Sequence, residues 1–265
     1  MKLDTITVGT KQITVPYYRA GQGEPLLYLH HFMGVVGWEP ALARLAEHFD
    51  VIAPFAPGWG AAKDELTKMN VGPLDLTLHN QDVLAALGVD SAHVVGVGIG
   101  AWLAAELAAI APACVRRLVL VNPVGIYLED AMGADPFAQS PAAPTEVLFS
   151  DPALRQKYLL DGRELVDALV EELLDLRAAA KFLWPIMETQ VRTRLPRIKA
   201  PTLVATSERD AIVPAAHGPE WARYIDGARQ AEIKGAGHLA ELERPDEFAR
   251  LVHDFIVADS VAAVA

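Results

Sequence analysis

The fold of this chain is decided by the stretch His93-Val94-Val95-Gly96-Val97-Gly98-Ile99-Gly100-Ala101-Trp102. An apolar strand pattern over His93–Val97 runs through a glycine-rich turn into the helical pattern Ala101–Ala111. Gly96 and Gly100 stand at the flanking positions of the pattern G-x-S-x-G, in which a strained turn pushes one side chain out above a sheet. The position between them, which carries a nucleophile in that pattern, is Gly98. Glycine tolerates strained backbone best, so we expect the turn to persist without its hydroxyl.

The same turn also fits a dinucleotide-binding fingerprint, with Gly96, Gly98 and Ala101 in G-x-G-x-x-A register. That motif follows the first strand of its sheet and needs an acidic residue about 20 positions further on. Several strand patterns precede this turn, and the next strand ends at Asn122-Pro123 without Asp or Glu. The dinucleotide interpretation is therefore the weaker of the two.

Outward from the turn, short apolar strand patterns alternate with helical patterns. The chain opens with two alternating segments, an expected antiparallel pair at Leu3–Val8 and Gln12–Tyr18. Further strands are expected at Pro25–His31, Phe49–Pro54, His93–Val97, Val115–Val121, Thr202–Thr206 and Gln230–Ile233. Helices are expected at Trp38–Glu47, Leu74–Leu87, Ala101–Ala111, Glu164–Ala180, near Pro214–Ile225 and through Phe248–Ile256. This alternation predicts an α/β fold with a mostly parallel, doubly wound sheet of about eight strands.

The strand rhythm stops near Pro123 and resumes at Thr202. The sequence between these points is helical and irregular, and prolines punctuate it. An insertion between strands of one sheet is most simply a cap over the carboxyl edge of the sheet, where such folds place their sites. We therefore expect a core of residues 1–123 and 197–265 and a helical cap, or lid, of residues 124–196.

The composition favours a soluble globular protein that binds a small molecule. The chain has 265 residues, 52% of them hydrophobic, and a net charge of −11. Phosphate binding needs basic clusters, and none is present, so we expect no nucleic-acid partner and no docking on an anionic membrane. No stretch reaches the roughly 18 apolar residues of a membrane helix. A single cysteine, Cys114, and a start without the form of a signal peptide fit a reducing cytoplasm. The oligomeric state stays open.

Four further segments stand in a specific order around the glycine-rich turn. They are Leu29–Gly34 (Leu-His-His-Phe-Met-Gly), Pro57-Gly58-Trp59-Gly60, Glu208–Pro214 and Gly235–His238. With them the chain resembles the α/β-hydrolase superfamily over nearly its whole length, and it is most similar to small capped esterases, C–C-bond hydrolases and epoxide-hydrolase relatives. The resemblance implies the α/β-hydrolase fold, with the turn at Gly98 as its nucleophile elbow.

The resemblance also implies roles for particular residues. Asp210 takes the acid position and His238 the base position, and their order after the elbow is that of the fold. An aspartate so placed holds the imidazole in one tautomer and stabilises its charged form. The oxyanion hole would use the backbone N–H groups of Phe32 and Ile99, which survive any change of side chain.

Three more residues are candidates for the substrate pocket: His31, Trp102 and Trp184. At His31 the family usually has glycine, so this side chain is either a packed core histidine or a substrate contact. The expected cap is rich in apolar residues, which suits a small and largely apolar substrate. We expect neither a metal site nor a cofactor.

Three interpretations of a site with Gly98 stay open. In the first, the chain is a cofactor-independent enzyme in which His238, oriented by Asp210, is a general base acting on substrate or water, in a space left by the missing side chain. In the second, it is a serine hydrolase, an esterase or C–C hydrolase, whose nucleophile has been replaced by Gly98. In the third, it is a non-catalytic binding relative, similar in this respect to the N-myc downstream-regulated family. Cys114 and Ser207 stand in the wrong places to replace the nucleophile.

Overall fold

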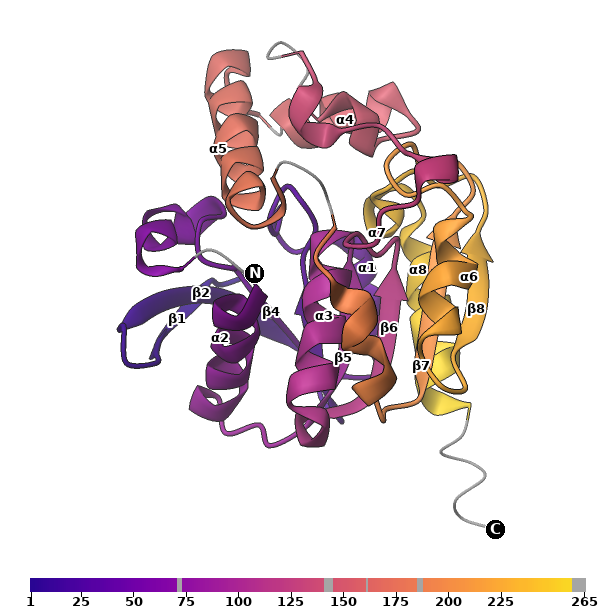
Figure 1. Cartoon of the computed structure of the whole chain (residues 1–265). Helices are drawn as coiled ribbons and strands as arrows, with labels where there is room; N and C mark the ends of the chain where they lie inside the picture. The colour runs from indigo at the N-terminus through magenta and orange to yellow at the C-terminus, as the bar shows by residue number, and fades with distance from the viewer. Residues whose placement is uncertain (71–72, 141–144, 161, 185–187, 259–265) are drawn as a thin grey trace.

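The computed structural model of the chain describes residues 1–70, 73–140, 145–160, 162–184 and 188–258. Its strands form one sheet in the order β1-β2-β4-β3-β5-β6-β7-β8 (Figure 1). The pairs β1–β2 and β2–β4 are antiparallel, and the other neighbouring pairs are parallel. The strands are β1 (Asp4–Val8), β2 (Ile13–Ala20), β3 (Pro25–Leu29), β4 (Asp50–Pro54), β5 (Ala92–Val97), β6 (Val115–Val121), β7 (Thr202–Ser207) and β8 (Arg229–Ile233). The predicted mostly parallel sheet of about eight strands is confirmed.

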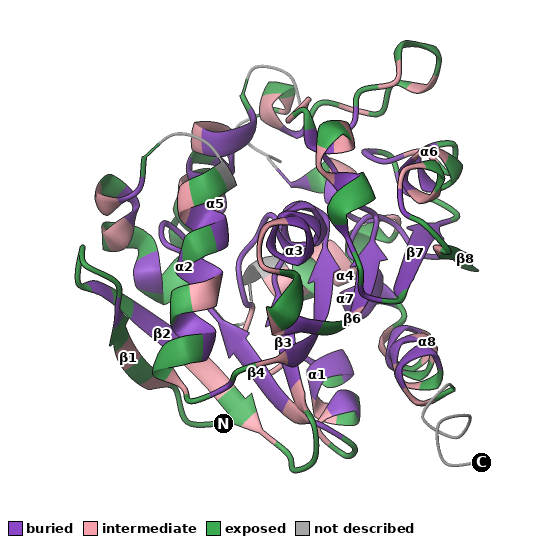
Figure 2. Cartoon of the chain, turned by 60° about the horizontal axis from the view of Figure 1, so that its bottom comes forward, coloured by how far each residue is buried: buried purple, intermediate pink, exposed green. Residues whose placement is uncertain are grey.

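Helices cover both faces of this sheet and leave its central strands buried (Figures 1 and 2). On one face lie α1 (Pro40–Leu45) and α8 (Pro245–Val257), and on the other α2 (Pro73–Ala86), α3 (Ile99–Ile110) and α6 (His217–Arg223). Successive residues of β3 alternate between the two apolar layers, with Leu27 in one and Tyr28 in the other. Both faces of the strand are therefore apolar, as in parallel sheets with helices on either side.

The segment between β6 and β7 carries α4 (Pro152–Leu160) and α5 (Leu165–Leu183), which Figure 1 places together at one end of the molecule. Lys181 of α5 donates to the carbonyls of Leu66 and Met69, in and after the 3-10 helix that follows β4. The N–H of His238, after β8, donates to Leu148 O at 3.1 Å. The inserted segment thus contacts loops at the carboxyl edge of the sheet, and its division from the core at residues 124–196 stays a prediction.

Several helix boundaries differ from the predicted ones for identifiable reasons. Among the described residues, four α-helices begin at a proline, at Pro40 in α1, Pro73 in α2, Pro152 in α4 and Pro245 in α8. The fixed φ of proline suits the first helical position. Two helices were not expected from the sequence, α4 and α7 (Ala240–Glu243), which has only four residues. Among the described residues, no helix combines the length and the apolar character that crossing a membrane requires.

One buried histidine makes the stability of the fold depend on pH. His79 of α2 is 4% exposed, and its ring nitrogens have no hydrogen-bond partner among the described residues. Burial lowers the pKa of His79 to about 4. The unfolded chain takes up this proton near pH 6.5, so the stability present above pH 6.5 is lost as the pH falls towards 4.

We therefore expect His79→Leu to make the fold less sensitive to acid. The variant removes two unpaired polar atoms, so it should be at least as stable as the parent at pH 7.5. Between pH 7.5 and pH 5 its advantage should grow by about 2 kcal/mol, the linkage value for a pKa moved from 6.5 to 4. Urea unfolding at both pH values measures this difference. An advantage that does not change with pH would contradict the assignment to His79.

Candidate active site

Gly98 forms a sharp turn between β5 and α3, with φ 58° and ψ −115°. Residues with a side chain rarely adopt such a positive φ. Its N–H donates to Val121 O of β6 at 2.9 Å, which fixes the turn to the sheet. The flanking glycines are required by close approach: a Cβ on Gly96 would lie 2.2 Å from the Gly100 oxygen, and one on Gly100 would lie 2.0 Å from the Leu29 oxygen. The turn has the strand–turn–helix form that the sequence predicts for an elbow.

Asp210 and His238 lie in contact, although 28 residues separate them in the sequence. The His238 Nδ1 lies 2.8 Å from the Asp210 Oδ2, and both side chains are fully buried. The other oxygen of Asp210 accepts the N–H groups of Ile212, at 2.8 Å, and Val213, at 2.9 Å. A carboxylate held in this way accepts the Nδ1 proton, so the lone pair of the imidazole is on Nε2. Among the described residues, Nε2 has no hydrogen-bond partner.

The free nitrogen of His238 lies against Gly98. A Cβ added to Gly98 would lie only 2.6 Å from Nε2 and 3.4 Å from Cε1. The expectation of an open space beside the imidazole is therefore wrong, because the ring itself fills the space of the missing side chain. Nε2 lies so close to the elbow that a side chain at residue 98 would press against it.

The peptide between His31 and Phe32 is held in one orientation. The carbonyl oxygen of His31 lies 2.8 Å from Nδ1 of His30 and accepts the N–H of Gly34 at 3.2 Å. In a trans peptide the N–H points away from the carbonyl, so the N–H of Phe32 faces the opposite side. Neither this N–H nor that of Ile99, the first residue of α3, has an acceptor among the described residues. Both N–H groups are thus available to donate to a substrate oxygen, as the predicted oxyanion role requires.

A line of aromatic rings leads away from the imidazole. The ring centroids of His238 and Phe32 are 5.5 Å apart, those of Phe32 and Phe137 6.2 Å, and those of Phe137 and Trp184 5.9 Å. Trp184 is 59% exposed, whereas Phe32 is fully buried. The surroundings of the base on this side are apolar. Trp184 therefore lies at the outer end of this line, two rings away from Phe32.

Trp102, another candidate for the substrate pocket, has its polar atom occupied. Its indole N–H donates to Glu106 Oε1 at 2.9 Å, one helical turn further along α3. Arg194, after the inserted helices, donates to both oxygens of the same carboxylate at 2.6 and 2.5 Å. The Trp102 side chain is fully buried. Through Glu106 and Arg194, Trp102 helps to link α3 to the end of the inserted segment.

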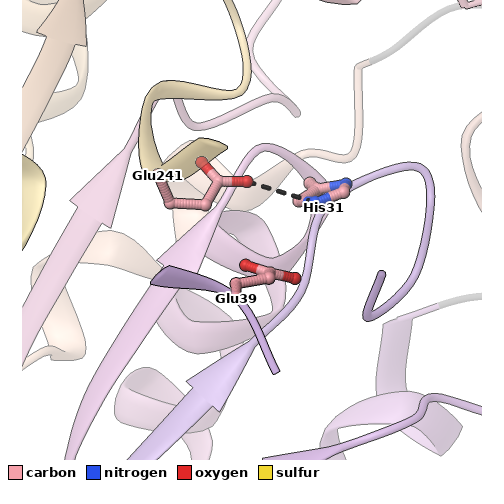
Figure 3. A group of neighbouring side chains, drawn as sticks. All are labelled: His31, Glu39 and Glu241. Carbon is pink, nitrogen blue, oxygen red and sulfur yellow. Dashed lines mark ion pairs between the residues drawn. The ribbon is translucent and has the colours of Figure 1, made fainter. Parts of the chain in front are cut away.

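His31 lies in a buried cluster with Glu39 and Glu241 (Figure 3). The N–H of Met33 donates to its Nδ1 at 3.1 Å, and its Nε2 lies 3.2 Å from Glu241 Oε1. Burial lowers the pKa of His31 well below its usual value and raises that of Glu241 well above. Burial also raises the pKa of Glu39 to about 8. These contacts fit the packed core histidine that was one of the two expectations for His31.

A cavity of about 270 Å³ opens between the turn after β3 and the inserted helices. Its described lining includes Met33, Val36, Tyr158, Glu171 and Asp175, and it does not include Gly98 or His238. The cavity therefore borders the segment that carries Phe32, while the base lies deeper in the fold.

Asn122 supports the loop of His238 and was not among the predicted site residues. It follows β6 in a left-handed conformation, φ 48°, which asparagine tolerates better than most residues. Its side-chain amide donates to Ser207 Oγ at 2.8 Å and to the carbonyl of His238 at 2.9 Å, and its oxygen accepts the N–H of Ser207 at 2.7 Å. It thus ties β6, β7 and the loop of His238 together. The signal was the pair Asn122-Pro123 at the carboxyl end of a strand.

We expect Asn122→Ala to lower the free energy of unfolding by about 3 kcal/mol, because several buried donors and acceptors lose their partner. Urea unfolding monitored by circular dichroism measures this loss. Asn70→Ala is the matched control, since Asn70 is exposed and its change should stay within about 0.5 kcal/mol. Equal losses in the two variants would contradict the role given to Asn122.

Comparison with known proteins agrees with this fold. Residues 26–251 match the model of the alpha/beta hydrolase family. The chain is 29% identical to 2-hydroxy-6-oxo-6-phenylhexa-2,4-dienoate hydrolase of Comamonas testosteroni, over 91% of both chains. It is 26% identical to pyrrolizixenacetamide deacetylase of Xenorhabdus hominickii, over 98% of this chain and all of the relative. A solved meta-cleavage product hydrolase from Pseudomonas fluorescens shares the fold with TM-score 0.77 and 19% identity, over 96% of this chain and 97% of the other. This chain belongs to the alpha/beta hydrolase family.

Proposed function

We propose that this protein is an enzyme that acts on a small, largely apolar carbonyl compound, without a nucleophilic serine and without a catalytic cofactor. His238, oriented by Asp210, is the general base, and the N–H groups of Phe32 and Ile99 bind the carbonyl oxygen. One observation carries the proposal: the His238 Nε2 lies 2.6 Å from where a Cβ of residue 98 would be. The base therefore lies directly beside the position of the nucleophile, where a bound carbonyl compound would meet it.

The chemistry follows from this placement. Nε2 takes a proton from the carbon beside the carbonyl group, the electron pair of that C–H bond moves towards the carbonyl, and the enolate oxygen is stabilised by the two amides. Asp210 stabilises the imidazolium that forms. Proton transfer from a carbon acid needs no space for water between base and substrate. Because the space at Gly98 is filled, we expect His238 to remove a proton from the substrate and not from a water molecule.

The substrate class rests on two observations. Aromatic rings line the approach from Trp184 through Phe137 to Phe32, next to the base. The Comamonas testosteroni relative is named as a hydrolase of a 6-oxo-6-phenyl-dienoate, a small carbonyl compound with an aromatic group. Both support a small molecule with a carbonyl group and an apolar body as the partner of this site.

The proposal is tested on the parent protein with a panel of small aryl ketones, 1,3-diketones, 2-hydroxy-6-oxo-dienoates and esters in D2O. Proton NMR follows deuterium uptake beside the carbonyl group and bond cleavage in the same sample. We expect deuterium uptake above the buffer rate beside the carbonyl group of at least one ketone of the panel. Ester hydrolysis alone, with no ketone affected, would contradict the proposed reaction.

A second candidate is a serine hydrolase whose nucleophile has been replaced by Gly98. It is favoured by the relatives, which include by name a hydrolase of a 6-oxo-6-phenyl-dienoate and a deacetylase. Under this alternative the parent protein turns over nothing in the panel, and a serine at position 98 brings activity back. A non-catalytic binding protein, the third interpretation, has no chemical need of the Asp210–His238 pair.

A further inference from the structure

The cluster of His31, Glu39 and Glu241 joins the two loops that carry the proposed site (Figure 3). His31 directly precedes Phe32, whose N–H is a proposed oxyanion donor. Glu241 lies in α7, three residues after His238. Glu39 directly precedes α1. Their ligating atoms lie within 4.8 Å of one another. The cluster belongs to neither loop alone, so it is in a position to set the distance between them.

The atoms that meet in the contact between His31 and Glu241 are buried and have no hydrogen-bond partner among the described residues. Both side chains are 0% exposed, and Nε2 of His31 lies 3.2 Å from Oε1 of Glu241. The two atoms are close, but their geometry is not that of a hydrogen bond. Among the described residues, neither Glu241 oxygen has any hydrogen-bond partner. If the two side chains separate, the Nε2 of His31 and the Oε1 of Glu241 lose a close polar neighbour in a buried environment, so the contact resists separation.

A metal ion is the first alternative for one imidazole and two carboxyl groups. The ring of His31 argues against it. Its Nδ1 accepts the N–H of Met33 at 3.1 Å, so the proton of the neutral ring is on Nε2. A protonated nitrogen has no lone pair for a metal, and ligating histidines donate their other N–H. This protonated Nε2 instead lies 3.2 Å from an oxygen of Glu241.

We propose that His31 and Glu241 are positioning residues that hold the turn carrying the Phe32 N–H against the loop carrying His238. Glu39 fixes the third side of the cluster, since it accepts the N–H of Val36 at 3.3 Å and the hydroxyl of Tyr28 at 3.4 Å. The contact between His31 and Glu241, which touches no substrate, then sets the separation between His238 and the Phe32 N–H. The catalytic meaning of this link rests on the proposed function, whereas the link itself does not.

The test measures the positions of the two loops in the folded protein, and it needs no substrate. NMR follows the low-field Nδ1–H signal of His238 and the hydrogen-exchange rates of the Phe32 and Ile99 amides. In Glu241→Leu we expect the His238 signal to shift or broaden and the Phe32 amide to exchange at least about tenfold faster, because their spacing is released. The Ile99 amide, which belongs to α3 and to neither of the two loops, should stay within about twofold. Glu241→Gln keeps a carbonyl oxygen for His31 and should restore the parent signals.

Matched variants separate positioning from general loss of stability. His93 and Glu24 form another His–Glu contact, 3.0 Å long, at the opposite end of β5, so Glu24→Leu should leave the His238 and Phe32 signals unchanged. If Glu241→Leu does not fold, His31→Gly gives the same test with the residue that the family usually has. Unchanged signals, equal acceleration of Phe32 and Ile99, or a raised melting temperature on adding Zn²⁺ or Mn²⁺ would each overturn the proposal. A protein that passes this test yet turns over no carbonyl compound would refute the proposed function alone.

Discussion

Gly98→Ser is expected to create a hydrolase of activated esters. The rate of p-nitrophenyl acetate hydrolysis should exceed that of Gly98→Ala by about 10²- to 10³-fold, with a burst of p-nitrophenol that reports an acyl-enzyme. The reason is that every other part of the triad is in place. The carboxylate of Asp210 holds Nδ1 of His238 at 2.8 Å, and the lone pair of Nε2 is directed at the elbow. A hydroxyl at residue 98 would be the missing member.

The size of this gain is limited by a steric conflict. The serine Cβ would lie 2.6 Å from Nε2, so the ring has to withdraw by about 1 Å to reach an ordinary contact. The φ of 58° adds a cost of about 1–2 kcal/mol for any residue with a side chain. Nε2 is at the far end of a rotatable side chain, so we expect the ring to move rather than the backbone. We therefore place the gain well below that of a natural serine enzyme.

Gly98→Ala is the matched control for this experiment. Alanine displaces His238 as serine does and carries no hydroxyl, so the difference between the two variants isolates the nucleophile. A fluorophosphonate probe should label Gly98→Ser and leave Gly98→Ala and the parent unlabelled. Equal ester hydrolysis by the serine and alanine variants, with both folded, would show that this site cannot support a serine nucleophile.

The elbow shows how far sequence reasoning reaches. The glycine-rich turn and the alternation of strands and helices predict the sheet and the elbow, because tight turns and parallel strands restrict the backbone to few conformations. The pair Asp210–His238 comes from the resemblance to the α/β-hydrolase superfamily. The position of the imidazole was beyond this reasoning. It depends on the path of the loop after β8, which the N–H of His238 fixes through Leu148 of the inserted segment. A contact between residues 90 positions apart leaves no local pattern.

The supporting residues divide in the same way. Glu106 follows Trp102 by four positions, so a helix over this segment predicts that the two side chains meet. Asn122 and Glu241 were not, because their partners come from separate strands and loops whose packing only the fold defines. His31 was recognised as a departure from the usual glycine, yet its partner Glu241 lies 210 positions away in the sequence.

Replacing His238 by alanine is expected to reduce turnover of any carbonyl substrate found for the parent protein by about 10²- to 10⁴-fold, the usual contribution of a general base. Asp210→Asn should also reduce kcat, because the amide can no longer accept the Nδ1 proton and the tautomer with a free Nε2 is no longer favoured. KM should change little in both variants, since neither side chain is assigned to ground-state binding. Steady-state kinetics on circular-dichroism-matched proteins measures the split.

Two further measurements decide whether this loss belongs to the base. His238→Ala leaves a hole beside Gly98, so added imidazole should restore part of the rate in proportion to the fraction of free base. His79→Leu removes another buried histidine, on α2, and should leave kcat unchanged. If His238→Ala turned over the substrate at the parent rate, the imidazole at the elbow would have no part in the reaction. The filled space at Gly98 would then be only a packing contact, and the binding interpretation of the site would be the stronger one.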